Sequence, residues 1–427
     1  MAGCLLGIYL RREGFEISIY EKRIDPRSTS IAEGRSINLA LSHRGIHALK
    51  KAGAFEEIEN WLIPMHGRMI HDKTGQLTEQ LYGKEGQSIN SVGRNDLNKS
   101  LIQTAESLGV TFFFNHKCEQ IDLKRTQLTV SHNGKYRSFN AAVILGADGA
   151  FSVVRQAMMR LDRFNYSQDY ISHGYKEISM KPIHGSFQMS PNHLHIWPRG
   201  SFMLIALPNP DQSFTCTLFY PHDRFDQFQS TSDISAFFKT EFPDVTDKIV
   251  DLSQQFLLNP TSSLVTIRSG PWYNNRTLLI GDAAHAIVPF YGQGMNAAFE
   301  DCRLLTEIGK SHDFNWTTTF ESYYHQRKKD ADAIAQLALD NFLEMRDHVA
   351  DDSFLLRKKK DAQLHDSYGE RWIPMYTMVT FEDLPYHIAQ SKGRAQERAL
   401  KIAQHDNRLD DDNYCFTLRE QILNGQM

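Results

Sequence analysis

A glycine-rich stretch near residue 290 has the residue types of a site for an anionic cofactor. Gly281–His285 reads GDAAH after an apolar strand, and Gly292–Asn296 reads GQGMN at the start of a helix. Asp282 at the strand end can accept hydrogen bonds from a ribityl chain, and the glycines let backbone N–H groups approach an anionic ring or a phosphate at a helix N-terminus. A plain glycine-rich turn does not require this Asp together with Asn296. The stretch therefore predicts a cofactor site.

Gly3 and Glu21 fit a second nucleotide-binding feature. In a dinucleotide-binding βαβ unit, the last glycine of GxGxxG lets the helix pack closely on the sheet, and an acid about 20 residues later accepts hydrogen bonds from a ribose. The sequence has a helical pattern over 3–12 and a strand pattern over 15–21 that ends at Glu21. The same combination also occurs by chance, and the first strand and first two glycines of the unit are not in the sequence.

Histidines and cysteines form no metal or disulfide pattern. His193 and His195 would share one face of a strand, but no third ligand accompanies them, so we expect no metal site. The five cysteines are scattered and never form a CxxC pair, which excludes a disulfide framework and a zinc ribbon. A reducing compartment fits this usage best.

Charge and hydropathy exclude two kinds of partner. The chain has 47 basic and 51 acidic residues, so no basic excess favours nucleic acid. The longest strongly apolar stretches, 141–145 and 202–207, are far shorter than the roughly 18 residues that cross a bilayer. We expect no membrane span and no secretory signal.

The elements that must position these residues follow from periodicity. Length alone favours two to three domains. Asp96 offers a capping side chain to one of the predicted helices. In chain order, the patterns predict helices over 42–59 and 94–108, strands within 115–132, a strand buried on both faces at 141–146, short strands between 173 and 267, a strand at 277–280 and helices after 296.

The motifs together resemble those of the kynurenine 3-monooxygenases, a family of FAD-dependent single-component aromatic hydroxylases. Gly281–Cys302 resembles the flavin motif of these hydroxylases, and Ala147–Gly149 (ADG) resembles their second fingerprint. Further long stretches occur in the order of the family over essentially the whole chain: 34–45, 64–72, 193–199, 213–219, 344–349 and 374–381.

The resemblance implies a fold of the α/β class, with a Rossmann-like FAD-binding domain of the aromatic hydroxylase type, an inserted β-sheet substrate domain and a C-terminal helical region. With the shift from helical to short-strand patterns, it predicts these boundaries: 1–60, 88–172 and 268–318 for the discontinuous FAD-binding domain, 61–87 and 173–267 for the substrate-domain sheet, and 319–427 for the helical region.

The activity implied by the resemblance is hydroxylation of L-kynurenine to 3-hydroxykynurenine in tryptophan catabolism toward NAD. FAD is the cofactor, NADPH is the reducing cosubstrate, and O2 supplies the oxygen through a flavin C4a-hydroperoxide. Because the flavin carries this chemistry, we name no catalytic acid, base or nucleophile. Two alternatives stay open: a hydroxylase of another aromatic acid on the same fold, and a truncated, inactive or merely ligand-binding remnant.

Four residues match the substrate contacts of the family: Arg68, Tyr82, Asn341 and Tyr376. The substrate carboxylate needs a fixed cation, and Arg offers a bidentate fork. The alternatives to a binding role are a surface ion pair for Arg68 and core packing for Tyr376. The apolar side of the site is expected from three residues for which core packing is an equally good explanation: Ile205, Leu207 and Phe219.

The positions that match FAD contacts of the family are Ala2, Tyr20, Glu21, Lys22, Arg23, Ala40, Arg94, Cys118, Asp282, Met295 and Asn296. Within this set, Glu21 is expected at the adenosine ribose, Arg94 at the pyrophosphate or the flavin, and Asp282 near the ribityl chain or the pyrophosphate. Ala40 and Cys118 are expected to contribute backbone or bulk.

The two ends of the sequence carry further expectations. Met1–Gly3 resembles the end of a GxGxxG loop, which predicts either a natural start upstream, with an apolar strand and GxG in frame, or a truncated product that binds FAD poorly. The polar residues 419–427 differ from the C-terminal membrane anchor of mitochondrial members, so the chain resembles the soluble, bacterial type and is expected in the cytoplasm.

Overall fold

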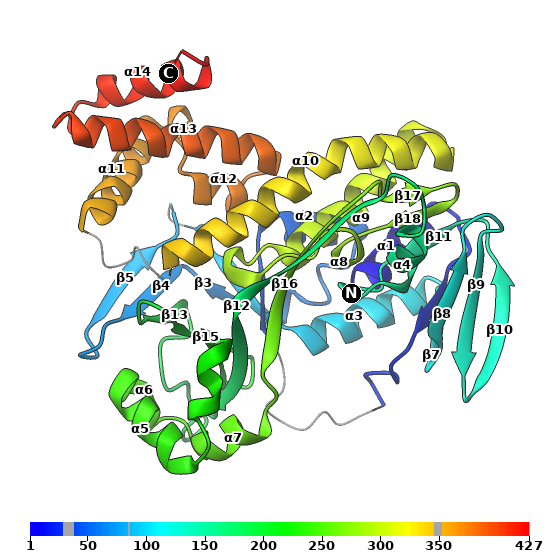
Figure 1. Ribbon diagram of the computed structural model, residues 1–427, viewed down its shortest axis with the longest axis horizontal. Coiled ribbons are helices and arrows are strands. Elements are labelled where there is room, and N and C mark those ends of the chain that lie inside the picture. Colours follow the sequence, from blue (N-terminus) through cyan, green and yellow to red (C-terminus); the bar gives the residue numbers. More distant parts are fainter. Residues whose placement is uncertain (29–37, 84–85, 346–351, 427) are drawn as a thin grey trace.

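The largest sheet combines strands from distant parts of the chain (Figure 1). Its neighbours are antiparallel except for the parallel pair β13–β4. In spatial order the strands are β16 (Ser262–Gly270), β12 (Asn165–Met180), β15 (Phe214–Pro221), β14 (Met203–Pro208), β13 (His193–Pro198), β4 (Gly67–His71) and β5 (Leu77–Leu81). The computed structural model describes residues 1–28, 38–83, 86–345 and 352–426, so the motif residues 34–37 and 346–349 lie outside the described residues.

This sheet separates two apolar cores because alternate side chains point to opposite faces. Trp197 packs on the side of three helices, α5 (Thr231–Glu241), α6 (Pro243–Thr246) and α7 (Leu252–Leu258), whereas its neighbour Ile196 packs toward the C-terminal helices. The sequence patterns predicted only strands between 173 and 267, which is wrong for these helices. The signal was present, since Ser230 and Asp233 form a reciprocal capping box at the start of α5.

The N-terminal part has the Rossmann-like character expected of it. Helix α1 (Ala2–Arg12) is buried along most of its length and packs against two helices, α3 (Arg94–Ser107) and α9 (Gly294–Ser311). Among the described residues, the parallel pairs of this part lie in two separate sheets: β1 (Ser18–Glu21) with β7 (Thr111–Phe114), and β11 (Ile144–Gly146) with β18 (Thr277–Leu279). In the second sheet β17 (Tyr273–Asn274) adds to β18 as an antiparallel neighbour. A meander beside them contains β8 (Lys117–Asp122), β9 (Gln127–His132) and β10 (Lys135–Asn140).

Two local expectations for this part are wrong. Helix α2 (His43–Ala52) ends well before residue 59, because Gly53 adopts a left-handed conformation at φ 62° and its N–H group bonds the carbonyl of Lys50. Asp96 lies in the first turn of α3 without a capping hydrogen bond, and Gly93 is the N-cap. A small sheet joins this part to the large sheet through β2 (Asn38–Leu41), β6 (Ile89–Gly93) and β3 (Ile63–Met65).

Helices cover the remaining face of the large sheet, as the sequence predicts after residue 296 (Figure 1). The helices with buried side chains in the cluster on this face are α9, α10 (Trp316–Leu343), α12 (Met375–Phe381) and α13 (Tyr386–His405). Two further helices, α11 (Asp352–Tyr368) and α14 (Asp412–Leu423), pack with α13 in a separate cluster. The shorter helices are α4 (Val153–Met158), α8 (Asp282–His285), η1 (Glu59–Trp61), η2 (His222–Gln227), η3 (Pro289–Tyr291) and η5 (Gly369–Arg371). Among the helices that the structure describes, none has both the length and the apolar character needed to cross a bilayer.

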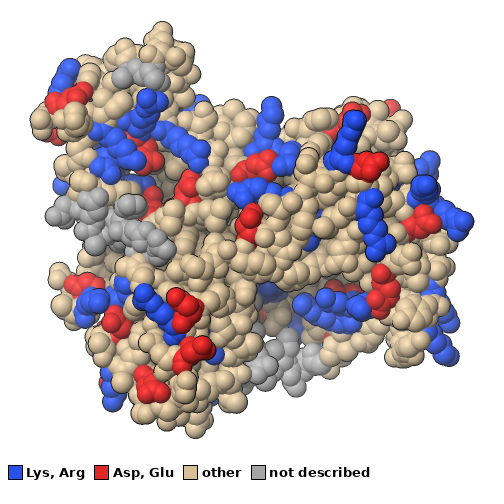
Figure 2. Space-filling model, in the orientation of Figure 1, with Lys and Arg blue, Asp and Glu red and all other residues tan. Residues whose placement is uncertain are grey.

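Charge is mixed on the face of the molecule shown in Figure 2. Lys and Arg side chains lie among Asp and Glu side chains over all of the visible parts, rather than gathering in one basic patch.

Candidate functional site

Arg68 lies on β4 beside the stacked rings of two tyrosines that come from distant elements. Its guanidinium carbon is 5.7 Å from the ring centroid of Tyr82, which follows β5, and 4.9 Å from that of Tyr376 on α12. The two rings are nearly parallel, with centroids 5.5 Å apart. The structure thus brings together three of the four predicted substrate residues, and Tyr376 is stacked in this group as well as packed.

Two buried polar atoms in this group have no hydrogen-bond partner in the described part of the chain: Arg68 Nε and the Tyr82 hydroxyl oxygen. Burial raises the pKa of Tyr82, so its hydroxyl stays protonated and can donate. Because unpartnered buried donors are costly, two of them side by side indicate a place where a ligand accepts hydrogen bonds. A carboxylate matches an arginine fork and a phenol.

The apolar residues expected beside this group pack against it. Leu207 is buried in one cluster with Met65 and Tyr82, and Ile205 and Tyr376 pack against that cluster. Phe219 faces Phe290, with ring centroids 4.9 Å apart, in the neighbouring cluster that Ile205 and Tyr376 also touch. These side chains provide an apolar wall next to the guanidinium.

Asn341, the fourth predicted substrate residue, is buried on α10 and engages the protein. Its amide donates to the carbonyl oxygen of Phe290 at 2.6 Å and contacts Met345 Sδ at 3.4 Å. This contact holds Phe290 against Phe342, with ring centroids 4.5 Å apart. Asn341 therefore positions the aromatic wall through its amide nitrogen.

Tyr291 is a site residue that the sequence reasoning missed. Its ring stacks on Tyr376 with centroids 5.4 Å apart, and burial raises its pKa well above the usual value, so the hydroxyl stays protonated. It lies in η3, directly before Gly292 and the start of α9. The signal was its place between the two glycine-rich halves of the cofactor motif. Tyr291 thus connects the predicted cofactor residues to the arginine–tyrosine group.

The cofactor motif has the backbone geometry that close approach of a ligand requires. Gly281 has φ 58° and Gly292 has φ 67°, both in the left-handed region. A Cβ on Gly281 would lie 3.1 Å from Cβ of Ala298, and one on Gly292 would lie 3.3 Å from Cβ of Ala40. Helix α9 then starts at Gly294, and the N–H groups of a first helical turn have no acceptor within the helix. These groups fit the anionic part of a flavin cofactor.

Asp282 is the first residue of α8. Its side chain keeps contact with solvent, although protein atoms surround most of it. This burial within the protein raises the pKa of its carboxyl above the usual value, while His285 and Arg94 act in the opposite direction. Arg94, exposed at the start of α3, supplies positive charge that acts on the Asp282 carboxyl, and its contact with the pyrophosphate or the flavin stays a prediction.

Asn296 is fully buried and holds the site together rather than offering its side chain to a ligand. Its amide donates to the carbonyl oxygens of Ala40 and Gly292, each at 2.8 Å, and its carbonyl oxygen accepts from the N–H group of Ser42 at 2.9 Å. These bonds fix the end of β2 against the start of α9. The Asn296 side chain is thus engaged by the protein, and the contact of Asn296 and Met295 with a cofactor stays a prediction.

The predicted adenosine side lies at the end of β1. Glu21 is the last residue of that strand, and its carboxylate accepts from the N–H group of Arg23 at 2.9 Å. Tyr20 stacks on Phe113, with ring centroids 4.8 Å apart. Lys22 and Arg23 are exposed, whereas Cys118 on β8 is half-buried, and burial raises the pKa of its thiol to about 11.

Ala2 and Asp148 make contacts within the protein near the predicted cofactor residues. Ala2 begins α1, and its carbonyl oxygen faces Sγ of Cys302 at 3.4 Å. Asp148 of the second fingerprint caps α4, since its carboxylate accepts from the N–H groups of Val153 and Val154 at 2.7 and 3.2 Å. Asp148 is therefore a local structural acid.

His193 and His195 do not converge on one point. His193 Nε2 lies 2.7 Å from Glu79 Oε1, whereas His195 is buried, with Nδ1 2.8 Å from His71 Nε2 and Nε2 2.8 Å from the carbonyl oxygen of Ser190. Both nitrogens of His195 thus have protein partners.

Comparisons with known proteins show the family to which the chain belongs. The family described as "FAD binding domain" matches residues 1–338. A protein of Cytophaga hutchinsonii named kynurenine 3-monooxygenase is 49% identical over 94% of this chain and 91% of its own length. One of the same name from Dictyostelium discoideum is 43% identical over 100% of this chain and 95% of its own length.

Solved structures support the fold. The structure of a tetrameric form of 2-methyl-3-hydroxypyridine-5-carboxylic acid oxygenase superposes with a TM-score of 0.67 over 82% of this chain and 91% of that chain, at 18% identity. This likeness shows the fold alone, whereas the long sequence matches at high identity assign the chain to a family. The chain belongs to the kynurenine 3-monooxygenase family, within the flavoproteins that share the FAD binding domain.

Proposed function

We propose that this chain hydroxylates L-kynurenine at ring position 3, with NADPH and O2 as cosubstrates. One oxygen atom of O2 enters the product 3-hydroxykynurenine, the other leaves as water, and NADPH supplies the two electrons. The single observation that carries the proposal is Arg68, whose buried Nε has no partner in the described structure and whose guanidinium lies beside the stacked rings of Tyr82 and Tyr376. Membership in the family supports the same substrate.

Arg68 would bind the carboxylate of the amino acid end of the substrate. Its charge is permanent, and the hydroxyl of Tyr82 can donate to the same carboxylate because burial keeps that phenol protonated. Two donors, one on β4 and one directly after β5, orient one end of the substrate, and this orientation decides which ring carbon is presented for reaction.

The aromatic and apolar side chains would hold the ring and exclude water. Leu207, Phe219 and Phe290 offer surfaces without donors or acceptors, and Tyr376 and Tyr291 stack beside them. A dry pocket strengthens the arginine–carboxylate contact and protects reactive oxygen chemistry from water. Asn341 acts as a positioning residue because its amide fixes the carbonyl of Phe290.

FAD would be held by the residues that have the matching donor chemistry. Glu21 suits the adenosine ribose, Arg94 the pyrophosphate, Asp282 the ribityl hydroxyls, and the first turn of α9 the anionic edge of the ring. When bound, FAD supplies the transfer of electrons from NADPH and the activation of O2. The protein residues named here bind, orient and desolvate.

The test uses purified protein and three readouts. We expect bound flavin in the absorbance spectrum, L-kynurenine-stimulated oxidation of NADPH, and 3-hydroxykynurenine in stoichiometric yield. 4-Hydroxybenzoate should not support coupled turnover, because a carboxylate on the ring and one on a flexible tail cannot reach Arg68 while presenting the same carbon. Coupled turnover of 4-hydroxybenzoate at comparable efficiency would favour a hydroxylase of another aromatic acid. Protein without flavin or turnover would favour the inactive remnant.

We also propose a cytoplasmic location. The five cysteines are all free thiols in the structure, which is usual for proteins of a reducing compartment.

A further inference from the structure

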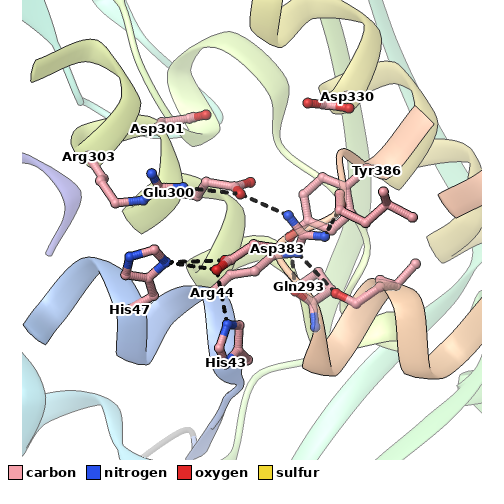
Figure 3. A network of polar contacts seen from close by, with 12 residues as sticks. His43, Arg44, His47, Gln293, Glu300, Asp301, Arg303, Asp330, Asp383 and Tyr386 are labelled. Carbon is pink, nitrogen blue, oxygen red and sulfur yellow. Dashed lines mark hydrogen bonds and ion pairs between the residues drawn. The ribbon is translucent and has the colours of Figure 1, made fainter. Parts of the chain in front are cut away.

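Three side chains outside the proposed site meet where α2 faces the loop between α12 and α13 (Figure 3). Asp383 Oδ2 lies 3.2 Å from His43 Nε2 and 3.1 Å from His47 Nδ1. One atom from each residue falls within 4.8 Å of the other two. The histidines point toward the same carboxylate, although 336 residues separate His47 from Asp383.

The two halves of this cluster are held at fixed positions before any ligand binds. His43 and His47 are four residues apart on α2, so they share one face of the helix. Arg44, between them in sequence, turns inward and donates to the carbonyl oxygen of Val379 at 3.0 Å and to that of Leu384. These two carbonyls lie on either side of Asp383 in the chain, so Arg44 fixes the loop from both sides.

Further contacts make Arg44 itself rigid. It is fully buried, forms an ion pair with Glu300 at 2.8 Å, and its guanidinium carbon lies 4.0 Å from the ring centroid of Tyr386 (Figure 3). A site whose ligands are fixed by such supporting contacts loses little conformational entropy on binding.

The geometry of the cluster suits a small transition metal ion. Zinc binds imidazole nitrogen and carboxylate oxygen at about 2.0 to 2.2 Å, which places tetrahedral ligand atoms about 3.4 Å apart. The distances of 3.1 and 3.2 Å around Asp383 Oδ2 are close to that separation. His43 and Asp383 are exposed and His47 is partly exposed, so an ion can enter and water can fill the fourth position.

We propose that His43, His47 and Asp383 bind a divalent transition metal ion of the zinc type, which joins the C-terminal helices to α2. The proposal stands apart from the hydroxylation, because none of the three residues belongs to the groups assigned to FAD or kynurenine. Asp383 follows α12, the helix that carries Tyr376, so the ion would stabilise the packing of that helix on the rest of the protein.

The test is a titration of chelator-treated, full-length protein with Co²⁺ at neutral pH. We expect one equivalent of Co²⁺ with the visible bands of tetrahedral coordination and without thiolate charge-transfer bands. Zn²⁺ should displace it and raise the Tm. Absence of stoichiometric binding to the unaltered protein would overturn the proposal, and thiolate bands would place the ion at a cysteine instead.

Variants assign the site. His47→Ala and Asp383→Asn should each weaken Zn²⁺ binding in calorimetry by roughly tenfold or more, since each removes one of three ligands. The matched control is His405→Ala, which removes an exposed histidine that lies 3.1 Å from Asp406 but has no third ligand in the described structure. Unchanged affinity in both His47→Ala and Asp383→Asn would contradict the site. Circular dichroism of each variant checks its fold, and the Co²⁺ spectrum of the unaltered protein decides the question if a variant does not fold.

Discussion

At the scale of single residues, the arginine–tyrosine group has more donors than the protein uses. Arg68 Nε and the Tyr82 hydroxyl are buried without partners in the described structure. Structural residues of this type are normally satisfied, so the excess donors favour a binding role over packing.

Arg68→Ala should remove the main anchor for the substrate carboxylate and leave FAD content unchanged. Loss of a charge-assisted contact in a dry site costs about 2 to 4 kcal/mol, so the affinity for L-kynurenine should fall roughly 30- to 1000-fold. Titration of the flavin absorbance with L-kynurenine measures it. Arg68→Lys keeps the positive charge but lacks the bidentate guanidinium, so its affinity for L-kynurenine should lie between those of Arg68→Ala and the unaltered protein. Near-normal affinity in Arg68→Ala would contradict the carboxylate assignment.

Tyr376→Phe separates the hydroxyl from the ring. The ring stacks on both Tyr82 and Tyr291, and Phe preserves those contacts. If the hydroxyl contacts the substrate, the same titration should show a loss of about 0.5 to 1.5 kcal/mol, with the fold and FAD content retained. Tyr136→Phe, at an exposed tyrosine on β10, is the control. An unchanged titration would leave Tyr376 with a packing role.

At the scale of elements, Asn296 joins β2 to α9 through three hydrogen bonds to backbone groups. Asn296→Ala leaves these buried groups unsatisfied, which should lower the free energy of unfolding by about 2 to 4 kcal/mol and weaken FAD retention. Urea unfolding and gel filtration of the flavin-loaded protein measure the two effects. Asn413→Ala, at an exposed position on α14, should change neither. Equal stability of Asn296→Ala and the unaltered chain would contradict the positioning role.

At the scale of the whole molecule, buried charged groups connect the helices and set the response to acid. Asp301 on α9 lies 2.6 Å from His285 Nε2 and 2.9 Å from Arg327 Nε on α10. Burial disfavours the charge of Asp301, but these two partners outweigh it and lower its pKa to about 2. Its contribution to stability is present above the pKa of the unfolded chain, near 4, and is lost as the pH falls toward 2.

Protonation linked to His195 lowers the stability of the fold at a milder pH than that of Asp301. Burial lowers its pKa to about 4 from an ordinary value of 6.5, so the unfolded chain binds the extra proton first. Stability should therefore fall as the pH drops from about 6.5 to 4, by roughly 3 kcal/mol for this group. His195→Gln keeps one acceptor and one donor and should reduce the loss between pH 7 and pH 5 in chemical unfolding. His405→Gln, at an exposed histidine, should leave the loss unchanged. An undiminished loss in His195→Gln would refute this assignment.

The sequence by itself determined the family, the glycine-rich cofactor motif and most helices, because these depend on residue types at short spacing. The helix predicted at 94–108 is α3 (Arg94–Ser107), and the strand predicted at 277–280 is β18 (Thr277–Leu279). Local hydrophobic periodicity and backbone requirements of glycine suffice for such features. The domain boundaries stay a prediction.

The tertiary structure alone decided which partner each polar side chain has. Asn296 and Asn341 resemble ligand contacts in sequence, yet their amides bond protein carbonyls. Asp383 meets His43 and His47 only because Arg44 fixes a distant loop beside α2. Such contacts arise from the packing of elements far apart in the chain, and this packing depends on the shapes and volumes of many side chains at once, which local patterns do not encode.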